Sequence, residues 1–542
     1  RGSHTLKFGS FYARHRFNGF SAFPTRGAYS FNGQFTRQAG TSGAGTALAD
    51  WALGTPSGVS RNILAGTFGM RFWDLAAFAD DSWRASNRLT LNFGLRYELQ
   101  APPYEVHDRW ANFNAGTAKL VMAGSGGAGR RLRSFDTNNF APRLGITYLL
   151  TQDRRTVLRT GFGVSYGEAK QGGGQLYKNL PYFFSQVITT DQNGRPPLRL
   201  SDGLPAPVPP DINNQEQLSS GSPTAWDFDL KSTRAMQWSL GIQREVLPDL
   251  LLDVSYVGTR TLGLIANVNL NQSFPGPGAQ GPRRPFYSVN PQVTNITYRT
   301  NYGAAKYHSL QARVEKRASR GLTVSLAYTW SHFLANAGNI NGGGNGPPQD
   351  ARCYRCEWGS TPEDRRHRIV INHVYELPFG AGRQFVNGGW AAQLLGNWNI
   401  SGIWTMSTGE HFTPGLAAAV SNSAGGGGER PDRLRDGNLP KSQRTIDRWF
   451  DIGAFGPPPQ FAFGNAGRGI LEGPGDFNVD LGIHRNFRFG ERRRLSFRWE
   501  MFNAINRANF GTPAAGIGNP TAGQIGGTGA ARIMQAALKL SF

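Results

Sequence analysis

Hydrophobic and polar residues alternate without interruption over the last nine positions of the chain, 534–542. Every second residue is apolar, from Met534 through Leu538 and Leu540 to Phe542, and small or polar residues lie between them. In a β-strand such alternation gives one apolar and one polar face, and roughly nine to eleven tilted residues cross a bilayer. The pattern predicts the closing strand of a transmembrane β-barrel, with Leu538, Leu540 and Phe542 as its C-terminal barrel-assembly signal and Phe542 in the interfacial aromatic belt.

The same period of two recurs in about fourteen segments, the first at 5–17, and the connections between them follow a rule of their own. Every second connection is a short link, at 85–88, 151–155, 247–249, 318–321 and 490–492. The connections between these hairpins are long and rich in Gly, Pro, Asn and Ser. They cover 101–141, 168–233, 259–304, 333–366, 408–475 and 504–532. Outer-membrane barrels have short periplasmic turns and long extracellular loops. Placing Phe542 on the periplasmic side puts every short turn there. One connection, 378–395, is longer than a turn, and we expect 384–390 to extend a strand.

Composition narrows the class of protein. Hydrophobic residues make up 39% of the 542 positions, mean hydropathy is -0.41, and no apolar run approaches the ~18 residues of a membrane helix, which excludes a helical membrane protein. The 71 glycines and 12% aromatic residues fit a large β protein rather than a disordered chain. The formal charge of +22 is scattered along strands and turns, so we expect no nucleic-acid partner. The chain starts at Arg1, and we expect any export signal to lie upstream.

Several segments together resemble one family. The segment 497–511, Phe-Arg-Trp-Glu-Met-Phe-Asn-Ala-Ile-Asn-Arg-Ala-Asn-Phe-Gly, followed by Pro513, is similar to the penultimate-strand signature of Oar-like TonB-dependent outer-membrane receptors. Matching stretches occur in the same order at 2–9, 78–84, 88–98, 364–367 and 375–380.

The resemblance implies an all-β, antiparallel barrel in the outer membrane of a Gram-negative-type cell. It implies that residues 1–542 are the C-terminal part of the barrel, about fourteen of a probable 22 strands. An N-terminal regulatory-like domain, a plug and a TonB box would lie outside this chain. It also implies active uptake of a bulky solute powered through the TonB complex, in contact with outer-membrane lipid and lipopolysaccharide.

Polar residues of the alternating strands are the candidate contacts for a solute or a plug, because alternation turns them toward the lumen. The alternative interpretation is that these side chains only make the lumen hydrated and pair with one another or with the plug. The candidates are Arg96, Glu98, Arg143, Arg159, Arg313, Glu315, Asp480, His484, Arg488, Arg498 and Glu500.

Cys353 and Cys356 are the only cysteines, and their spacing in a loop predicted to be extracellular favours a local disulfide. A zinc site would need about four ligands, and only Asp364 and His367 lie near in sequence. The run 364–367, Asp-Arg-Arg-His, has no neighbouring nucleophile or second acid, so we expect charged groups at the outer mouth of a strand that form ion pairs and contact lipopolysaccharide head groups. We expect no cofactor, no metal site and no enzymatic activity.

Three alternatives to a transporter stay open at this point. A structural or adhesive outer-membrane barrel would bind partners through its long loops, a passive porin would close with fourteen strands, and a soluble all-β carbohydrate-binding protein would not enter the membrane. The solute itself also stays open among oligosaccharide, peptide and metal chelate, because the loops 168–233 and 408–475 contain no recognisable ligand motif.

Overall fold

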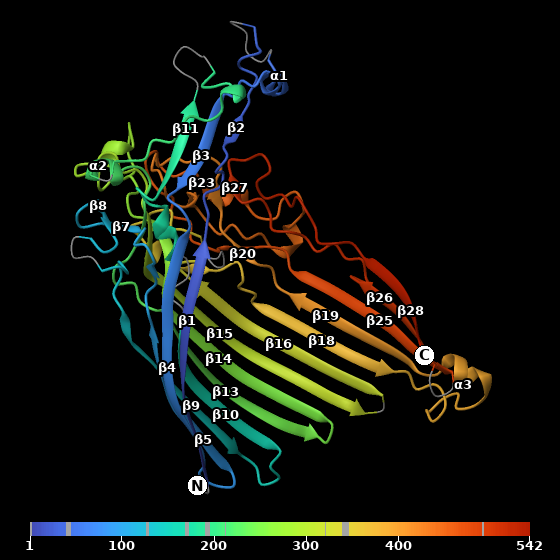
Figure 1. The fold of residues 1–542 in the computed structure, drawn as a ribbon. Coiled ribbons are helices and arrows are strands. Elements are labelled where there is room, and N and C mark those ends of the chain that lie inside the picture. The colour runs from blue at the N-terminus through green and yellow to red at the C-terminus, as the bar shows by residue number, and fades with distance from the viewer. Residues whose placement is uncertain are drawn as a thin grey trace.

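The computed structural model describes residues 3–38, 45–125, 129–167, 173–189, 196–211, 213–319, 321–338, 346–489 and 493–542. One large curved sheet dominates it, and loops gather at one end (Figure 1). The long strands are β1 (His4–Gly19), β4 (Phe68–Arg84), β5 (Leu89–Gln100), β9 (Asp136–Leu149), β10 (Thr156–Tyr166), β13 (Arg234–Leu247), β14 (Leu250–Asn269), β15 (Thr297–Ser319), β16 (Leu322–Ala335), β18 (His367–Glu376), β19 (Trp398–Ser407), β25 (Asp476–Phe489), β26 (Arg493–Phe502) and β28 (Ile533–Ser541).

These long strands form an antiparallel meander in which spatial order follows chain order from β1 to β28. Three further short strands, β6 (Tyr104–Glu105), β12 (Thr224–Trp226) and β17 (Gly359–Ser360), bring the sheet to 17. The antiparallel all-β architecture predicted from alternation is therefore confirmed. The strand number of the complete barrel stays a prediction.

The register of the strand pairings places polar residues of neighbouring strands on one face of the sheet and apolar residues on the other. Ser325 on β16 lies opposite Asn372 on β18, and Ile403 on β19 lies opposite Asp480 on β25. The other face carries large exposed apolar side chains such as Leu144, Leu240 and Leu538. We call the two sides the polar face and the apolar face. A slip of one residue in any pairing would exchange them.

The loop end contains most of the smaller elements. They are the strands β7 (Ala111–Asn114), β8 (Lys119–Met122), β20 (His411–Phe412), β21 (Gly415–Leu416), β22 (Asp432–Arg433), β23 (Phe455–Gly456), β24 (Leu471–Glu472) and β27 (Gly516–Ile517), the helix α2 (Gln215–Leu218), and the 3-10 helices η1 (Gly173–Lys178), η2 (Leu200–Asp202), η3 (Gly281–Arg283), η4 (Arg355–Glu357), η5 (Lys441–Gln443) and η6 (Ile452–Ala454). A separate arm made of β2 (Ala28–Ser30), β3 (Gly58–Leu64), β11 (Phe183–Thr189) and α1 (Ala47–Ala52) projects beyond them (Figure 1).

The hydrophobic core lies in these loops, which we call the loop head, rather than in the wall. Three clusters of buried side chains fill it: one around Trp110 and Trp226, one around Phe113 and Ile296, and one around Phe450. In the described part of the chain no such cluster lies midway along the wall, since its two faces need only lipid and a wet lumen opposite them.

The opposite end of the sheet holds the short turns and both chain termini (Figure 1). The links at 490–492 and at 320 lie outside the described residues. The expectation that 384–390 extends a strand is wrong, because the connection between β18 and β19 contains the helix α3 (Gly389–Leu395) instead. Arg485 reaches from the apolar face of β25 to the carbonyl oxygens of Gln393 and Leu394 at the end of α3. A side chain 91 residues from Leu394 in sequence thus holds the last turn of this helix, which local alternation could not reveal.

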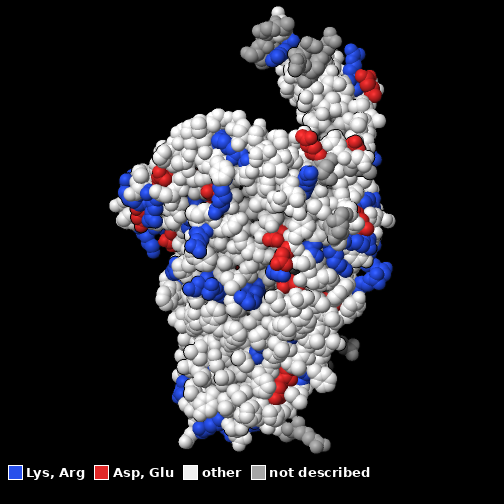
Figure 2. Space-filling view, turned by 90° about the vertical axis from the view of Figure 1, so that its left-hand side faces the viewer, with Lys and Arg blue, Asp and Glu red and all other residues white. Residues whose placement is uncertain are grey.

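Charge on the surface follows the same division into two ends. Figure 2 shows dense Lys, Arg, Asp and Glu near the loop end, a further group at the lower rim, and few charges in the zone between them. Among the described residues, no helix has the length and apolar character needed to span a membrane.

The sheet has two unpaired edges in the described part of the chain. β28 pairs with β26 and β1 pairs with β4, but β28 and β1 do not pair with each other. Leu6, Phe8, Leu538 and Leu540 at these edges are strongly exposed. Unpaired backbone N–H and C=O groups in lipid each cost several kcal/mol, so these edges need a partner strand.

We predict that residues 1–542, refolded alone in detergent, do not form a stable monomeric barrel, because both edges would remain unpaired. The check is gel migration of unheated and heated samples. A compact, heat-resistant monomer band would contradict this expectation.

Candidate functional site

All eleven residues predicted to face the lumen lie on the polar face. Residues opposite each other on paired strands lie on the same face, so the pairings carry this face across the sheet. Examples are Glu98 opposite Asn139, Arg159 opposite Gly241 and Glu500 opposite Gly482. Arg488 also belongs to this face by its place in β25, but its side chain lies outside the described part of the chain. Their shared face is a finding, whereas contact with a solute or a plug stays a prediction.

Within this face the structure brings some predicted residues together and leaves others apart. Arg96 and Glu98 form an ion pair of 2.5 Å, and Arg313 and Glu315 form one of 2.9 Å. Each pair is two residues apart on one strand, which is the spacing at which side chains share a face. These four groups therefore already have partners within their own strands.

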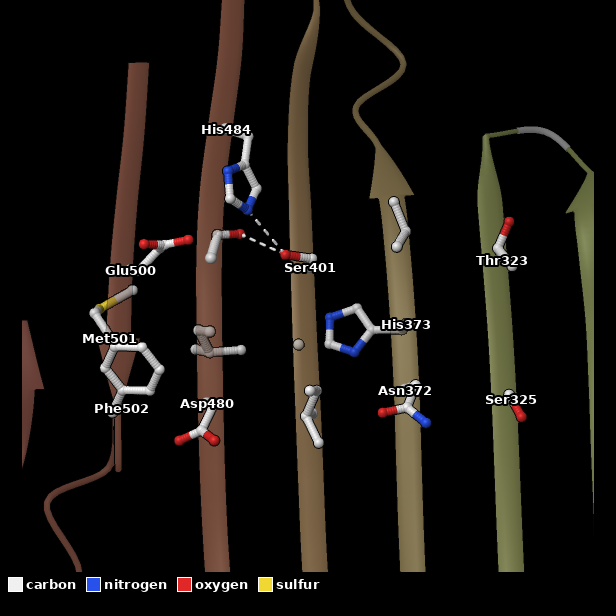
Figure 3. A pocket seen from close by; sticks show the side chains of 15 residues that line it. Thr323, Ser325, Asn372, His373, Ser401, Asp480, His484, Glu500, Met501 and Phe502 are labelled. Atoms are coloured by element: carbon white, nitrogen blue, oxygen red, sulfur yellow. Dashed lines mark hydrogen bonds between the residues drawn. The ribbon is translucent and has the colours of Figure 1, made fainter. Parts of the chain in front are cut away.

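Asp480, His484 and Glu500 line a cavity of about 440 Å³ over β16, β18, β19, β25 and β26 (Figure 3). His484 Nε2 lies 3.1 Å from Ser401 Oγ. This contact requires glycine at position 482, since a Cβ there would lie 2.5 Å from His484 Nε2 and 2.8 Å from Ser401 Oγ. The cavity wall thus combines hydroxyl, amide, imidazole and carboxylate groups.

Both carboxylates of this cavity accept hydrogen bonds from neighbours. Asp480 Oδ1 accepts from the Asn503 backbone N–H and from the Asn478 side-chain amide, each at 2.9 Å. Glu500 Oε2 accepts from Gln535 Nε2 at 2.6 Å. Their remaining oxygen lone pairs are suited to hydroxyl or amide donors of a polar solute.

The Ser401–His484 contact differs from a catalytic triad. In such a triad a third group orients the histidine, and in the described residues no carboxylate hydrogen-bonds to His484. The arrangement favours binding through hydrogen bonds.

A second cavity of about 460 Å³ lies on the polar face over β1, β4, β5 and β9. Arg143 lines it together with Lys7 and Asp80, which sequence reasoning missed. Asp80 and Asp81 are adjacent acids, so alternation alone does not tell which of them faces inward. The register places Asp80 opposite Lys7, while Asp81 turns to the apolar face and lies 2.7 Å from His4 Nδ1.

A buried ion-pair network joins two long loops in the loop head. Glu357 is fully buried, and its Oε2 accepts from Arg430 Nη1 at 2.7 Å and also from Arg468 Nε. Burial on its own would raise the pKa of the Glu357 carboxyl, but the two guanidinium groups lower it below the ordinary value. The network links the segment 346–366 to the segment 408–475.

Asp364 does not occupy the position expected from the sequence. The expectation placed it at an exposed mouth in contact with lipopolysaccharide, and this is wrong, because its side chain is fully buried. Its Oδ1 accepts from the Phe333 backbone N–H at 2.9 Å, and His332 and His411 lie 3.6 Å from Oδ2. The carboxylate therefore holds loop ends together.

Cys353 and Cys356 are joined by a disulfide with a Cα–Cα distance of 5.4 Å. The described residues contain no group of three or more His, Cys, Asp or Glu side chains arranged to hold a metal ion.

Comparison with known proteins now identifies the family. The model of the outer membrane beta barrel domain matches residues 1–535. The chain belongs to this family. It is therefore a protein of the Gram-negative outer membrane, as predicted from the closing strand and the loop pattern.

The chain is also similar to solved structures of outer-membrane proteins. The outer membrane transporter YddB from Escherichia coli matches with a TM-score of 0.52 and 11% identity, covering 100% of this chain and 52% of that one. The siderophore receptor PirA from Acinetobacter baumannii matches at 0.45 and 10%, and the ferric-catecholate import receptor Fiu from E. coli K12 at 0.44 and 12%; each comparison covers 99% of this chain and 52% of the other. No curated protein matches the sequence.

The chain thus spans about half the length of these structures. The predicted likeness to TonB-dependent outer-membrane receptors is confirmed at the level of the fold. The Oar-like subtype stays a prediction.

We predict that Glu357→Gln destabilises the loop head by about 3 kcal/mol, because it leaves the buried guanidinium of Arg430 and the partly buried one of Arg468 without their anion. Protease protection of the segments 346–366 and 408–475 should fall. Since the folded pKa of Glu357 is lowered, its stabilisation is complete above about pH 4.3 and is lost as the pH falls through the lower folded value. Asp350→Asn, which removes the partially exposed pair with Arg352, is the control and should change stability little.

We predict that the disulfide persists in exported protein, where the surroundings are oxidising. Alkylation of the denatured protein should add no label before reduction and should label both cysteines after it, as measured by mass spectrometry. Labelling without reductant would refute the disulfide.

Proposed function

We propose that this chain forms part of the barrel wall and the loop head of an outer-membrane transporter. The transporter takes up a bulky solute with energy supplied through TonB. The observation that carries the proposal is the unbroken polar face, which runs from β4 to β26 behind an apolar face. A wall of this kind separates a wet lumen from lipid. The match to the barrel family and the fold shared with YddB, which is described as an outer membrane transporter, support it.

The loop head supports uptake of a selected solute rather than open diffusion. Its segments are packed around three hydrophobic clusters and joined by the network of Glu357, Arg430 and Arg468. Binding groups on such loops keep fixed positions, which lowers the entropy lost when a solute binds. Coupling to TonB, and a plug that contacts the polar face, would involve residues outside 1–542.

One observation favours adhesion as the second candidate. The arm of β2, β3, β11 and α1 projects beyond the loop head (Figure 1). Its side chains Leu48, Trp51 and Leu53 are exposed. Exposed apolar patches of this kind often mark protein contacts. Deletion of the arm would abolish adhesion but leave uptake intact if the two functions are separate.

We predict that uptake by cells that produce the full-length protein depends on TonB and on the polar cavity. Uptake of oligosaccharide, peptide and metal-chelate pools should fall to background for one of these classes in a tonB deletion. Asp480→Asn combined with Glu500→Gln should lower that uptake about ten-fold, because two charge-assisted acceptors are lost.

Asp436→Asn in an exposed loop is the matched control, and surface levels of both variants are compared with wild type. TonB-independent uptake would contradict active transport. Unchanged uptake by the double variant would remove the cavity from the pathway.

A further inference from the structure

A cleft in the loop head combines an apolar lining from Leu132 and Phe228 with the side chains of three arginines. Arg130, Arg131 and Arg133 line a cavity of about 570 Å³ together with Ser134 and Phe228. No aspartate or glutamate lines it. The volume lies in the range of sites for small organic ligands.

A second, small cavity shares Arg131, Leu132 and Arg133 with the lining of this cleft. It measures about 10 Å³, room for a single water molecule or one ligand oxygen. Trp110 and Trp226 line it, and their side chains are 3% and 2% exposed. Neither indole Nε1 has a hydrogen-bond partner. A buried N–H without an acceptor costs about 1–3 kcal/mol, so two at one place indicate a missing acceptor.

The three arginines differ in how their charges are balanced. Arg130 Nε donates to Asp108 at 2.6 Å, and the Asp136 carboxylate favours the charged form of Arg133, whose pKa burial lowers to about 10. Arg131 donates to the Pro102 carbonyl oxygen and stacks over the Tyr104 and Phe135 rings. In the described part of the chain no carboxylate lies within ion-pair distance of Arg131. The cleft therefore has an excess positive charge at Arg131.

We propose that this cleft binds an oxyanion group, carboxylate or phosphate, of the imported solute. The Arg131 guanidinium supplies the charge, and the indole N–H groups of Trp110 and Trp226 supply neutral donors in the small cavity that shares Arg131 with the cleft. Guanidinium groups are well matched to both oxyanions, because their donors form a planar fork. This inference rests on the proposed function and names the substrate class as acidic.

The test is calorimetric titration of the full-length protein, purified from outer membranes, with glucuronate, glucose 6-phosphate and glucose. These probes share one ring and differ in carrying a carboxylate, a phosphate or no charge. We expect at least one acidic probe to bind at least ten-fold more tightly than glucose, and added salt to weaken that binding. The acidic probe with the higher affinity identifies which oxyanion the site prefers.

Variants assign the binding to this cleft. Arg131→Gln should weaken binding of the acidic probe about ten-fold, and Arg131→Lys should restore part of it, because it returns the charge but not the fork. Trp226→Phe, which keeps an aromatic ring and removes the N–H, should weaken binding about three-fold to ten-fold. Arg448→Gln, an exposed arginine beside Asp451, is the matched control and should bind as wild type. Thermal unfolding of each variant shows whether the fold is retained.

Equal binding of glucose, binding by neither acid, or wild-type affinity in folded Arg131→Gln would each overturn the proposal. The proposed function fails separately. Acid binding without TonB-dependent uptake would retain the cleft and reject transport, whereas TonB-dependent uptake without acid binding would retain transport and reject the cleft.

Discussion

Pairing of backbone N–H and C=O groups between antiparallel neighbours is the constraint on which the rest of this structure depends. In lipid no water can satisfy these groups, so each strand must find a neighbour along its whole length. The register that results also decides chemistry, because a slip of one residue exchanges the two faces. The polar face is continuous from β4 to β26 because the register is kept through the middle of each pairing and shifts only toward strand ends.

The loop head is stabilised in a different way. Its segments have few regular backbone pairings, so buried side chains carry its stability. Phe113, Phe450 and Leu471 are buried nearly completely, and the charged Glu357 is buried with Arg430 and Arg468 around it. A buried charge is tolerated only with close partners, which is why these three side chains fix the relative positions of separate loops.

The wall and the loop head offer different chemical groups to a solute. The wall offers polar groups at fixed spacing, such as Asp480, His484 and Glu500, and among the described residues no carboxylate hydrogen-bonds to His484. The proposed oxyanion site in the loop head has a different character, because the indole N–H groups of Trp110 and Trp226 have no acceptor there and Arg131 has no carboxylate partner among the described residues. The hydroxyl groups of a solute could donate to the carboxylates of the polar face, and its acidic groups could accept from the donors of the loop head. One solute with both kinds of group would then contact the two regions in turn.

The sequence by itself determined the all-β architecture, the two ends of the sheet and the common face of residues such as Arg96, Glu315 and Glu500. These features depend on a period of two and on loop length, which are local properties. Only the tertiary structure decided that Asp80 faces inward and Asp81 outward, and that α3 replaces an expected strand. It also decided the burial of Asp364 and the contact of Glu357 with Arg468, 111 residues away. Such contacts depend on which loops meet in space, and alternation along a strand carries no information about that.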